Sequence, residues 1–217
     1  MPPERRPLSE WAENNIELAV GARPGPIRLW QFQREIADAI GDPKIERVTV
    51  VKPARVGYTT LLSAAVASYV VNDPAAIMCL LPTEDDARRF VVDEVEPIFD
   101  ASSSLEGYLT SGADETNRNT LYHRRFPGGS LKLVSAKAPR NLRGHTVRIL
   151  MMDEVDGMEP TKEGDPTLLA EKRTQSIPDR KIILGSTPVD EETSTVLERF
   201  ALSDQRHFEV PCLSCGT

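Results

Sequence analysis

The stretch VTVVKPARVGYTTLLSAAV, residues 48–66, passes from an apolar strand pattern through a short loop into a helical pattern. The phosphate-binding pattern GxxxxGK(S/T) has the same setting, in which backbone N–H groups and a helix N-terminus surround phosphate oxygens. Here the pattern is altered, because Lys52 stands in place of the first Gly and Tyr58 in place of the Lys. Gly57 and Thr59 keep their usual positions. The loop therefore indicates a nucleotide site only if another cation replaces the missing one.

Lys52 is the candidate replacement. It stands at the opposite end of the loop from Thr59, and a flexible four-carbon side chain can reach phosphate from either side of a short loop. Arg55 adds a second cation in mid-loop. The hydroxyl at the end of the pattern binds Mg²⁺, and here that position is Thr59. Taken alone, the loop is equally compatible with an ordinary strand–turn–helix that carries a solvated Lys.

A second motif, RILMMDEVDG at residues 148–157, is an apolar strand that ends in Asp153 and Glu154. Phosphoryl transfer needs a carboxylate near Mg²⁺ and a group that orients or deprotonates the attacking water. Adjacent carboxylates at the C-terminal end of a strand supply both, and this edge of an open α/β sheet is where ligands bind. The alternative is a strand followed by an ordinary acidic turn. The phosphate-type loop upstream favours the functional interpretation.

Three further stretches have a functional and an ordinary interpretation. In KIILGSTPVD, residues 181–190, the hydroxyls of Ser186 and Thr187 could contact a γ-phosphate, or the strand simply ends in a turn. In LWQFQREI, Gln33 could bond an adenine edge, while Trp30 and Phe32 favour a buried aromatic face. The loop SAKAPRNLRGHTVR could contact nucleic-acid phosphates or supply an Arg to a nucleotide, or it is a solvated basic loop with Lys137, Arg140 and Arg143.

The order of apolar runs predicts a parallel sheet covered on both faces, because strands rich in Val, Ile and Leu alternate with helical stretches. The expected strands are residues 45–51, 75–81, 121–126, 130–136, 147–154 and 181–188. The expected helices are residues 9–20 with Ser9 as the cap, 29–40 ended by Gly41, 59–71, and 83–99 with Thr83 as the cap. Residues 100–120 are polar and are expected to form a mobile loop.

Composition sets the limits on function. The chain has 217 residues, 40% hydrophobic and 27% charged, with a net charge of −7, which weakly opposes a dedicated DNA-coating module. It has no membrane-spanning run and no apolar stretch in its first residues, so a soluble, intracellular protein is expected. Cys79 lies in an apolar run typical of core, whereas Cys212 and Cys215 supply only half the ligands of a zinc site. The three His residues show no ligand spacing, and none is expected to be catalytic.

Together, the motifs resemble the N-terminal ATPase part of a phage terminase large subunit of the lambda-like type. The resemblance runs from about Leu29 to the last residue. Members of this family have phosphate loops in which the Lys stands at the start of the loop. The resemblance therefore makes Lys52 at the start, and Tyr58 at the usual Lys position, expected features. The resemblance implies an α/β fold, a three-layer αβα P-loop NTPase of the ASCE type with a mostly parallel central sheet. It is carried by VVKPARVGYTT, SAKAPRNLRG, RILMMDEVDGM, EGDPTLLAEKRT, KIILGSTPVD and HFEVPCLSCG.

The resemblance also implies roles for individual residues. Ser186 and Thr187 match the motif that couples hydrolysis to movement, Gln33 is similar to an adenine-contacting Gln, and Arg143 is similar to a family Arg that could act as a finger toward ATP. The expected metal-binding residues are Thr59 and Asp153. The expected catalytic residues are Glu154, Lys52, Arg55 and Arg143. The expected nucleotide-binding residues are Lys52, Pro53, Ala54, Arg55, Val56, Gly57, Tyr58, Thr59, Thr60, Gln33, Asp153, Ser186 and Thr187.

The function implied by the resemblance is hydrolysis of ATP, with Mg²⁺, to move double-stranded DNA into a procapsid in the host cytoplasm. The implied partners are double-stranded DNA, a portal protein, a small terminase subunit and further copies in a ring on the portal, with no membrane. Two alternatives stay open: a helicase-like DNA translocase ATPase, and a non-hydrolysing nucleotide-binding scaffold module, which the missing Lys at Tyr58 suggests.

The expected organisation is a leader at residues 1–28, an ATPase domain at 29–211 and the start of a truncated CxxC linker at 212–217. Family members continue into an RNase-H-like nuclease domain, and no cluster of nuclease acids follows the GSTP segment. The sequence is therefore expected to be a motor-domain fragment that hydrolyses ATP weakly in isolation and does not cut DNA.

Overall fold

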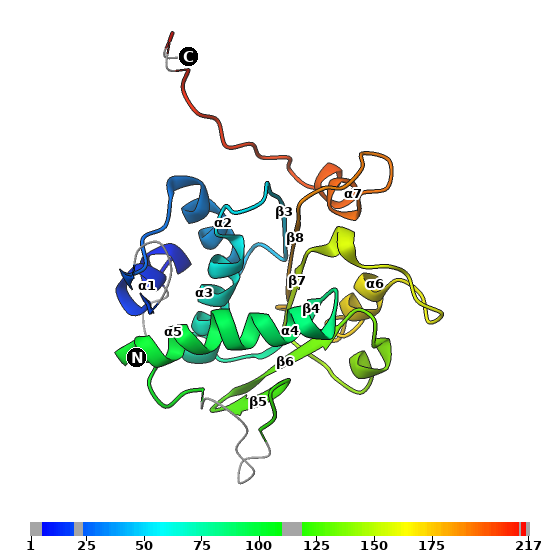
Figure 1. Cartoon of the computed structure of the whole chain (residues 1–217), viewed down its shortest axis with the longest axis horizontal. Coiled ribbons are helices and arrows are strands. Elements are labelled where there is room, and N and C mark those ends of the chain that lie inside the picture. The colour runs from blue at the N-terminus through cyan, green and yellow to red at the C-terminus, as the bar shows by residue number, and fades with distance from the viewer. Residues whose placement is uncertain (1–5, 20–23, 110–118, 213, 216–217) are drawn as a thin grey trace.

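The computed structural model describes residues 6–19, 24–109, 119–212 and 214–215. Its centre is a six-stranded sheet in the order β3-β8-β7-β4-β6-β5 (Figure 1). Neighbouring strands are parallel except for the antiparallel pair β5 and β6, so the predicted mostly parallel sheet is confirmed. The strands are β3 (Arg47–Val51), β4 (Ala76–Leu81), β5 (His123–Phe126), β6 (Gly129–Ser135), β7 (Ile149–Asp153) and β8 (Lys181–Ser186).

Helices cover both faces of this sheet, which gives the expected three layers (Figure 1). Strand β4 shows why, since Ile77 and Cys79 lie in one core cluster while Met78 and Leu80 lie in the other. The prediction that Cys79 is a core residue is confirmed. The first cluster packs against α1 (Leu8–Asn15), α2 (Gln31–Gly41), α3 (Tyr58–Val71) and α5 (Glu96–Ala101). The second packs against η3 (Pro139–Leu142), α6 (Pro166–Glu171) and α7 (Thr195–Ala201).

The single helix predicted over residues 83–99 is three segments in the structure. They are α4 (Glu84–Arg89), a π-helix η1 (Phe90–Val95) and α5. Thr83 is the cap, as predicted, because its hydroxyl accepts a hydrogen bond from the Asp86 backbone N–H at 3.1 Å. The interruption has a local reason: Pro97 has no N–H to donate, and the Glu96 N–H bonds to the Val91 carbonyl, five residues back.

The N-terminal helix differs from its prediction at both ends. It begins at Leu8 after Pro7, so Ser9 lies inside it and is not the cap. The Ser9 N–H instead donates to Asp38 Oδ1 at 2.9 Å, which means that a side chain from α2 supplies the capping acceptor. The helix ends at Asn15, and β1 (Glu17–Leu18) then pairs with β2 (Gly25–Pro26). The contact of Ser9 with Asp38 joins two helices, so the local spacing of apolar residues could not reveal it.

Other boundaries lie close to their predictions. The turn at Pro127 and Gly128 joins β5 to β6 as an antiparallel hairpin. In the predicted loop at residues 100–120, a 3-10 turn η2 (Ser103–Leu105) buries Leu105, while residues 110–118 lie outside the described part. No helix of the described ranges is long and apolar enough to cross a membrane.

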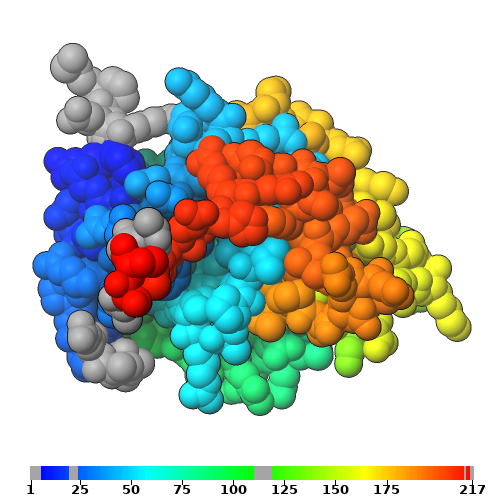
Figure 2. Space-filling view, turned by 90° about the horizontal axis from the view of Figure 1, so that it is seen from above, coloured from blue at the N-terminus to red at the C-terminus, as the bar shows by residue number. Residues whose placement is uncertain are grey.

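The C-terminal segment leaves α7 without regular secondary structure (Figure 1). Seen from above in Figure 2, this red segment runs from α7 toward the blue N-terminal part of the molecule. The ring of Phe208 meets the ring of Phe32 on α2 edge-on, with centroids 5.8 Å apart. Cys212 and Cys215 are exposed at its end. The segment therefore contacts α2 through an aromatic pair.

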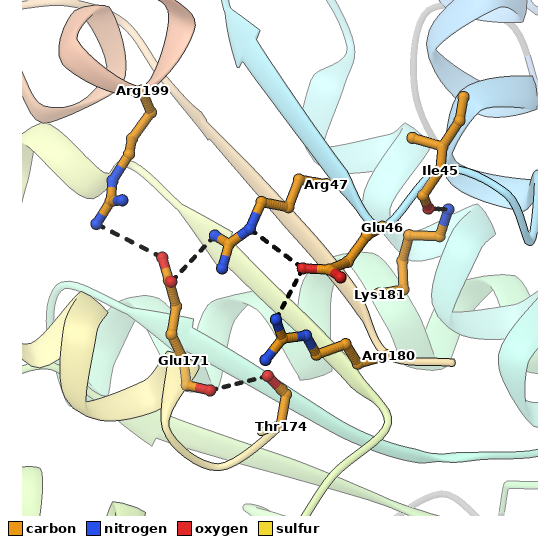
Figure 3. Close-up of polar contacts among 8 residues, drawn as sticks. All are labelled: Ile45, Glu46, Arg47, Glu171, Thr174, Arg180, Lys181 and Arg199. Atoms are coloured by element: carbon orange, nitrogen blue, oxygen red, sulfur yellow. Dashed lines mark hydrogen bonds and ion pairs between the residues drawn. The ribbon is translucent and has the colours of Figure 1, made fainter. Parts of the chain in front are cut away.

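Charged side chains tie the N-terminal ends of β3 and β8 to α6 and α7 (Figure 3). Glu171 on α6 pairs with Arg47 at 3.0 Å and with Arg199 on α7 at 3.6 Å. Beside them, the buried Lys181 ammonium donates to the carbonyl oxygens of Ala39, Asp42 and Ile45, which end α2 and lead into β3. Lys181 thus satisfies the Ala39 carbonyl, in the last turn of α2 where carbonyls lack intrahelical partners, and two carbonyls of the turn that follows.

Replacing Lys181 by Met tests this capping. Because Met keeps the apolar stem and removes the donor, we expect the free energy of unfolding to fall by about 2 kcal/mol.

Burial lowers the pKa of Lys181 from 10.5 to about 8. The unfolded chain therefore binds more protons between these values, and the contribution of Lys181 to stability rises with pH in this window. Denaturant unfolding should show a larger difference between wild type and Lys181→Met at about pH 9.5 than at about pH 7; equal differences contradict the assignment.

Candidate active site

The loop at residues 52–57 joins β3 to the N-terminus of α3. Two of its residues have left-handed backbone angles: Arg55 with φ of 63° and Gly57 with φ of 73°. Gly57 is required for space as well, because a Cβ there would stand 2.7 Å from Gln33 Nε2. The strained Arg55 places the turn in mid-loop and leaves its side chain exposed. The loop therefore has the strand–turn–helix shape that the sequence predicted.

Lys52 meets both predicted carboxylates at the C-terminal edge of the sheet. Its Nζ lies 2.5 Å from Glu154 Oε1 and 3.5 Å from Asp153 Oδ1. The Lys52 side chain and the Asp153 side chain are each 7% exposed, whereas Glu154 is 48% exposed. Glu154 has a left-handed backbone with φ of 54°, and its N–H donates to Asp153 Oδ1 at 2.9 Å. The structure thus brings together one cation from the end of β3 and two acids from the end of β7.

The buried carboxyl of Asp153 is electrostatically unusual. Burial raises its pKa, and the neighbouring Lys52 ammonium pulls it down less strongly than burial pushes it up. Asp153 with Thr59, at the start of α3, offers oxygen ligands of the kind that Mg²⁺ takes alongside phosphate and water. Within the described ranges no group of three or more His, Cys, Asp or Glu could hold a metal.

The end of β8 completes this edge. The Ser186 hydroxyl lies 3.4 Å from Glu154 Oε2, and the Thr187 N–H donates to the same oxygen at 3.5 Å. Ser186 also accepts a hydrogen bond from the Asp156 N–H at 3.2 Å. The Ser186 hydroxyl and the Thr187 backbone N–H therefore lie against the predicted catalytic carboxylate.

Asp156 is a residue of this edge that the sequence interpretation missed. Its carboxylate accepts from the Ser194 hydroxyl at 2.6 Å, from the Val196 N–H at 2.9 Å and from the Val189 N–H at 3.3 Å. It thereby ties the turn after β7 to the segment after β8 and to the start of α7. The signal was present as the third acid of DEVD, but an acidic turn gives no sign of its partners.

Gln33 holds the loop from the side of α2. Its Nε2 donates to the Val56 carbonyl at 2.8 Å, and its Oε1 accepts from the Trp30 N–H at 2.9 Å. Beside it lies a cavity of about 580 Å³ whose wall includes Trp30, Gly57 and Thr60. The predicted buried aromatic face is wrong for Trp30, which is 64% exposed at this cavity. Local periodicity could not reveal that α2 borders an open space.

The predicted arginine finger, Arg143, pairs with an acid in the loop before α6. Arg143 is 69% exposed, and its guanidinium donates to Glu163 Oε2 at 2.8 Å. Arg140 pairs with the same carboxylate at 3.7 Å. Within this chain, the structure gives Arg143 an acidic partner in the loop before α6. Its role toward ATP stays a prediction.

The sheet order, the loop after β3 and the acids after β7 define a P-loop NTPase fold. The sequence matches the family described as "Phage terminase large subunit gpA, ATPase domain" over residues 21–217. The chain therefore belongs to this family of phage terminase ATPase domains.

Two curated relatives agree with this assignment. The chain is 33% identical to the large terminase subunit of Escherichia phage lambda over 222 residues, which cover 99% of this chain and 34% of that protein. It is also 33% identical to the large terminase subunit of Enterobacteria phage P21, over 95% of this chain and 33% of that protein. The chain thus spans about a third of the length of these relatives.

Solved structures share the fold. The large terminase of bacteriophage HK97 superposes with a TM-score of 0.71 at 15% identity, over 90% of this chain and 40% of that one. An ATPase-domain variant of the Thermus phage P74-26 large terminase superposes with a TM-score of 0.58 at 18% identity, over 87% of this chain and 76% of that one. At these identities the likeness supports the fold alone.

Proposed function

We propose that this chain binds and hydrolyses ATP with Mg²⁺ as the motor domain of a terminase large subunit. The observation that carries the proposal is the contact of Lys52 with Asp153 and Glu154 at the C-terminal edge of the sheet. Phosphoryl transfer needs a cation for the phosphates, a carboxylate for the metal and a group that orients water, and these three residues supply one each.

The proposed roles follow from position. Lys52 and Arg55 contact phosphate oxygens together with the loop backbone, and Asp153 with Thr59 holds Mg²⁺, which when bound neutralises charge on the phosphates. Glu154, the more exposed of the two acids, orients the attacking water. The Ser186 hydroxyl and the Thr187 backbone N–H both contact the Glu154 carboxylate, so these two residues respond to a change at Glu154. The remaining proposed nucleotide contacts are those of the loop, of Thr60 and of Gln33.

Asp156 extends this edge into the rest of the domain. Because it bonds both the turn after β7 and the start of α7, a shift at Glu154 is transmitted to α7 and the segment beyond it. We propose that this path couples hydrolysis to the movement of double-stranded DNA into a procapsid. The partners are then the DNA, a portal protein, a small terminase subunit and neighbouring copies in a ring, in the host cytoplasm.

The proposed ATPase domain is residues 29–211, with a leader at 1–28 and a linker that begins at 212. Family membership favours this function over a helicase-like translocase, since the matched family and both curated relatives are terminases. The paired acids favour hydrolysis over a passive nucleotide-binding module, because such a module needs no water-orienting carboxylate.

A direct experiment measures nucleotide binding and phosphate release by residues 1–217, with Mg²⁺ or with a chelator. We expect binding of ATP and release of phosphate that depends on Mg²⁺. Asp153→Asn should abolish the Mg²⁺-dependent release of phosphate. Asp179→Asn changes an exposed residue, so it is the matched control and should leave that release intact. Binding without any phosphate release would favour the passive module, and no binding at all would contradict the proposed function.

A further inference from the structure

Tyr58 is a buried side chain at the centre of the candidate site. It is the first residue of α3, where the general phosphate-loop pattern has its Lys, and it is 4% exposed. Its ring lies against the backbone of Gly185 near the end of β8. A Cβ at Gly185 would stand 2.5 Å from Tyr58 Cζ and 2.7 Å from the hydroxyl oxygen. The sequence therefore keeps Gly in β8 where the ring needs the space.

The ring of Tyr58 also lies next to the ammonium of Lys52. The Nζ atom is 5.3 Å from the ring centroid, which is within the range of a cation–π contact. The same Nζ contacts Glu154 and Asp153. The ammonium thus has an aromatic neighbour in addition to the two carboxylates, and this neighbour keeps its attraction when a carboxylate contact is given up.

The hydroxyl of Tyr58 makes no hydrogen bond to the described part of the chain. The hydroxyl is also buried. Burial raises the pKa of Tyr58 well above its ordinary value, and the negative charges of Asp153 and Glu154 raise it further. A buried donor without an acceptor is unfavourable. Its presence beside two acids points to a state of the site in which one of them becomes its acceptor.

We propose, building on the ATPase function above, that Tyr58 is a positioning residue for Lys52. Its ring face holds the ammonium in place as Lys52 exchanges Glu154 for the terminal phosphates of the nucleotide. A Lys at the front of the loop hangs on a flexible stem with many rotamers, and a ring at this position restricts them. The hydroxyl then donates to the carboxylate that Lys52 has left. Tyr58 thus occupies the position of the usual Lys, and there it directs the positive charge of Lys52, which comes from the start of the loop.

The first test needs no nucleotide. In NMR spectra of the ligand-free protein, with the Lys52 signals assigned by comparison with Lys52→Ala, ring currents should displace the Hε protons of Lys52. We expect this displacement in wild type and in Tyr58→Phe, which keeps the ring, and its loss in Tyr58→Leu. An undisplaced Lys52 signal in wild type contradicts the proposal.

The second test separates turnover from binding. Because a desolvated cation–π contact corresponds to roughly a 30-fold change in rate, Tyr58→Leu should lower kcat by about 30-fold. The KM for ATP should change by less than about threefold, since the phosphate loop stays in place. Tyr58→Phe, which keeps the ring, should lower kcat by only about threefold, through loss of the hydroxyl.

Tyr69→Leu is the matched control, because Tyr69 is a second buried ring of α3 whose hydroxyl donates to the Ile40 carbonyl at 2.8 Å. It should lower stability but leave kcat and the Lys52 signal unchanged. The proposal is overturned if Tyr58→Leu keeps full kcat, or if Tyr69→Leu reproduces its loss. The two proposals fail separately: a wild-type chain that does not bind nucleotide contradicts the ATPase function, whereas the displaced Lys52 signal tests the ring contact alone.

Discussion

Replacing Lys52 by Ala is expected to lower the rate of ATP hydrolysis by at least about 100-fold. The reason is that Lys52 is the buried cation of the site, held against Glu154 and Asp153, while the helix position that usually carries the Lys is occupied by Tyr58. Steady-state phosphate release at saturating ATP measures the effect. Lys44→Ala, which removes an exposed Lys just before β3, is the matched control and should keep full activity.

The same substitution also has a structural consequence. Removing Lys52 leaves the buried Asp153 carboxylate without its cation, and breaking a buried ion pair from one side costs about 3 kcal/mol of stability. The activity of Lys52→Ala should therefore be measured at a temperature where circular dichroism shows the chain still folded. A folded Lys52→Ala protein with unchanged turnover would contradict the proposed role of Lys52 as the cation that contacts phosphate.

The second large effect is expected from Glu154→Gln. Removing the carboxylate that we propose orients water should lower turnover by about 10²–10⁴-fold, while Mg-ATP still binds. Binding is expected to tighten, because Lys52 no longer has to leave an ion pair at 2.5 Å before it contacts phosphate. Stopped-flow turnover and titration with a fluorescent ATP analogue measure the two quantities.

Glu159→Gln is the control for this substitution, since Glu159 is exposed and follows the same strand. It should leave turnover and affinity unchanged. Full turnover by Glu154→Gln would place the water-orienting group at another residue. Loss of nucleotide binding in Glu154→Gln would show that this carboxylate holds the substrate or the metal and does not orient water.

The mostly parallel sheet could be predicted because its strands have distinctive local patterns. Buried strands have a distinctive composition, and the carboxyl ends of parallel strands share one edge, so Lys52 after β3 and Asp153 at the end of β7 lie on the same edge. The strand order, which places only β8 between β3 and β7, is decided by the fold and not by local patterns. Strands β5 and β6 were predicted from the same kind of pattern, and the structure adds that they pair antiparallel.

The features that could not be predicted depend on partners distant in sequence. Ser9 looks like a helix cap, but Asp38 on α2 supplies the capping acceptor. Trp30 looks like a core residue because local periodicity does not record the cavity beside α2. Asp156 looks like one acid of an acidic turn, and its bonds to Ser194 and Val196 appear only in the folded chain. Sequence patterns report the element, whereas tertiary contacts decide what its side chains do.

A crystal structure of this chain with Mg²⁺ and a non-hydrolysable ATP analogue tests the central claim most directly. The account predicts that Lys52 Nζ has left Glu154 and lies within hydrogen-bond distance of the terminal phosphates, with the triphosphate enclosed by residues 52–59. A triphosphate bound away from this loop, with Lys52 still on Glu154 or turned toward solvent, would contradict it.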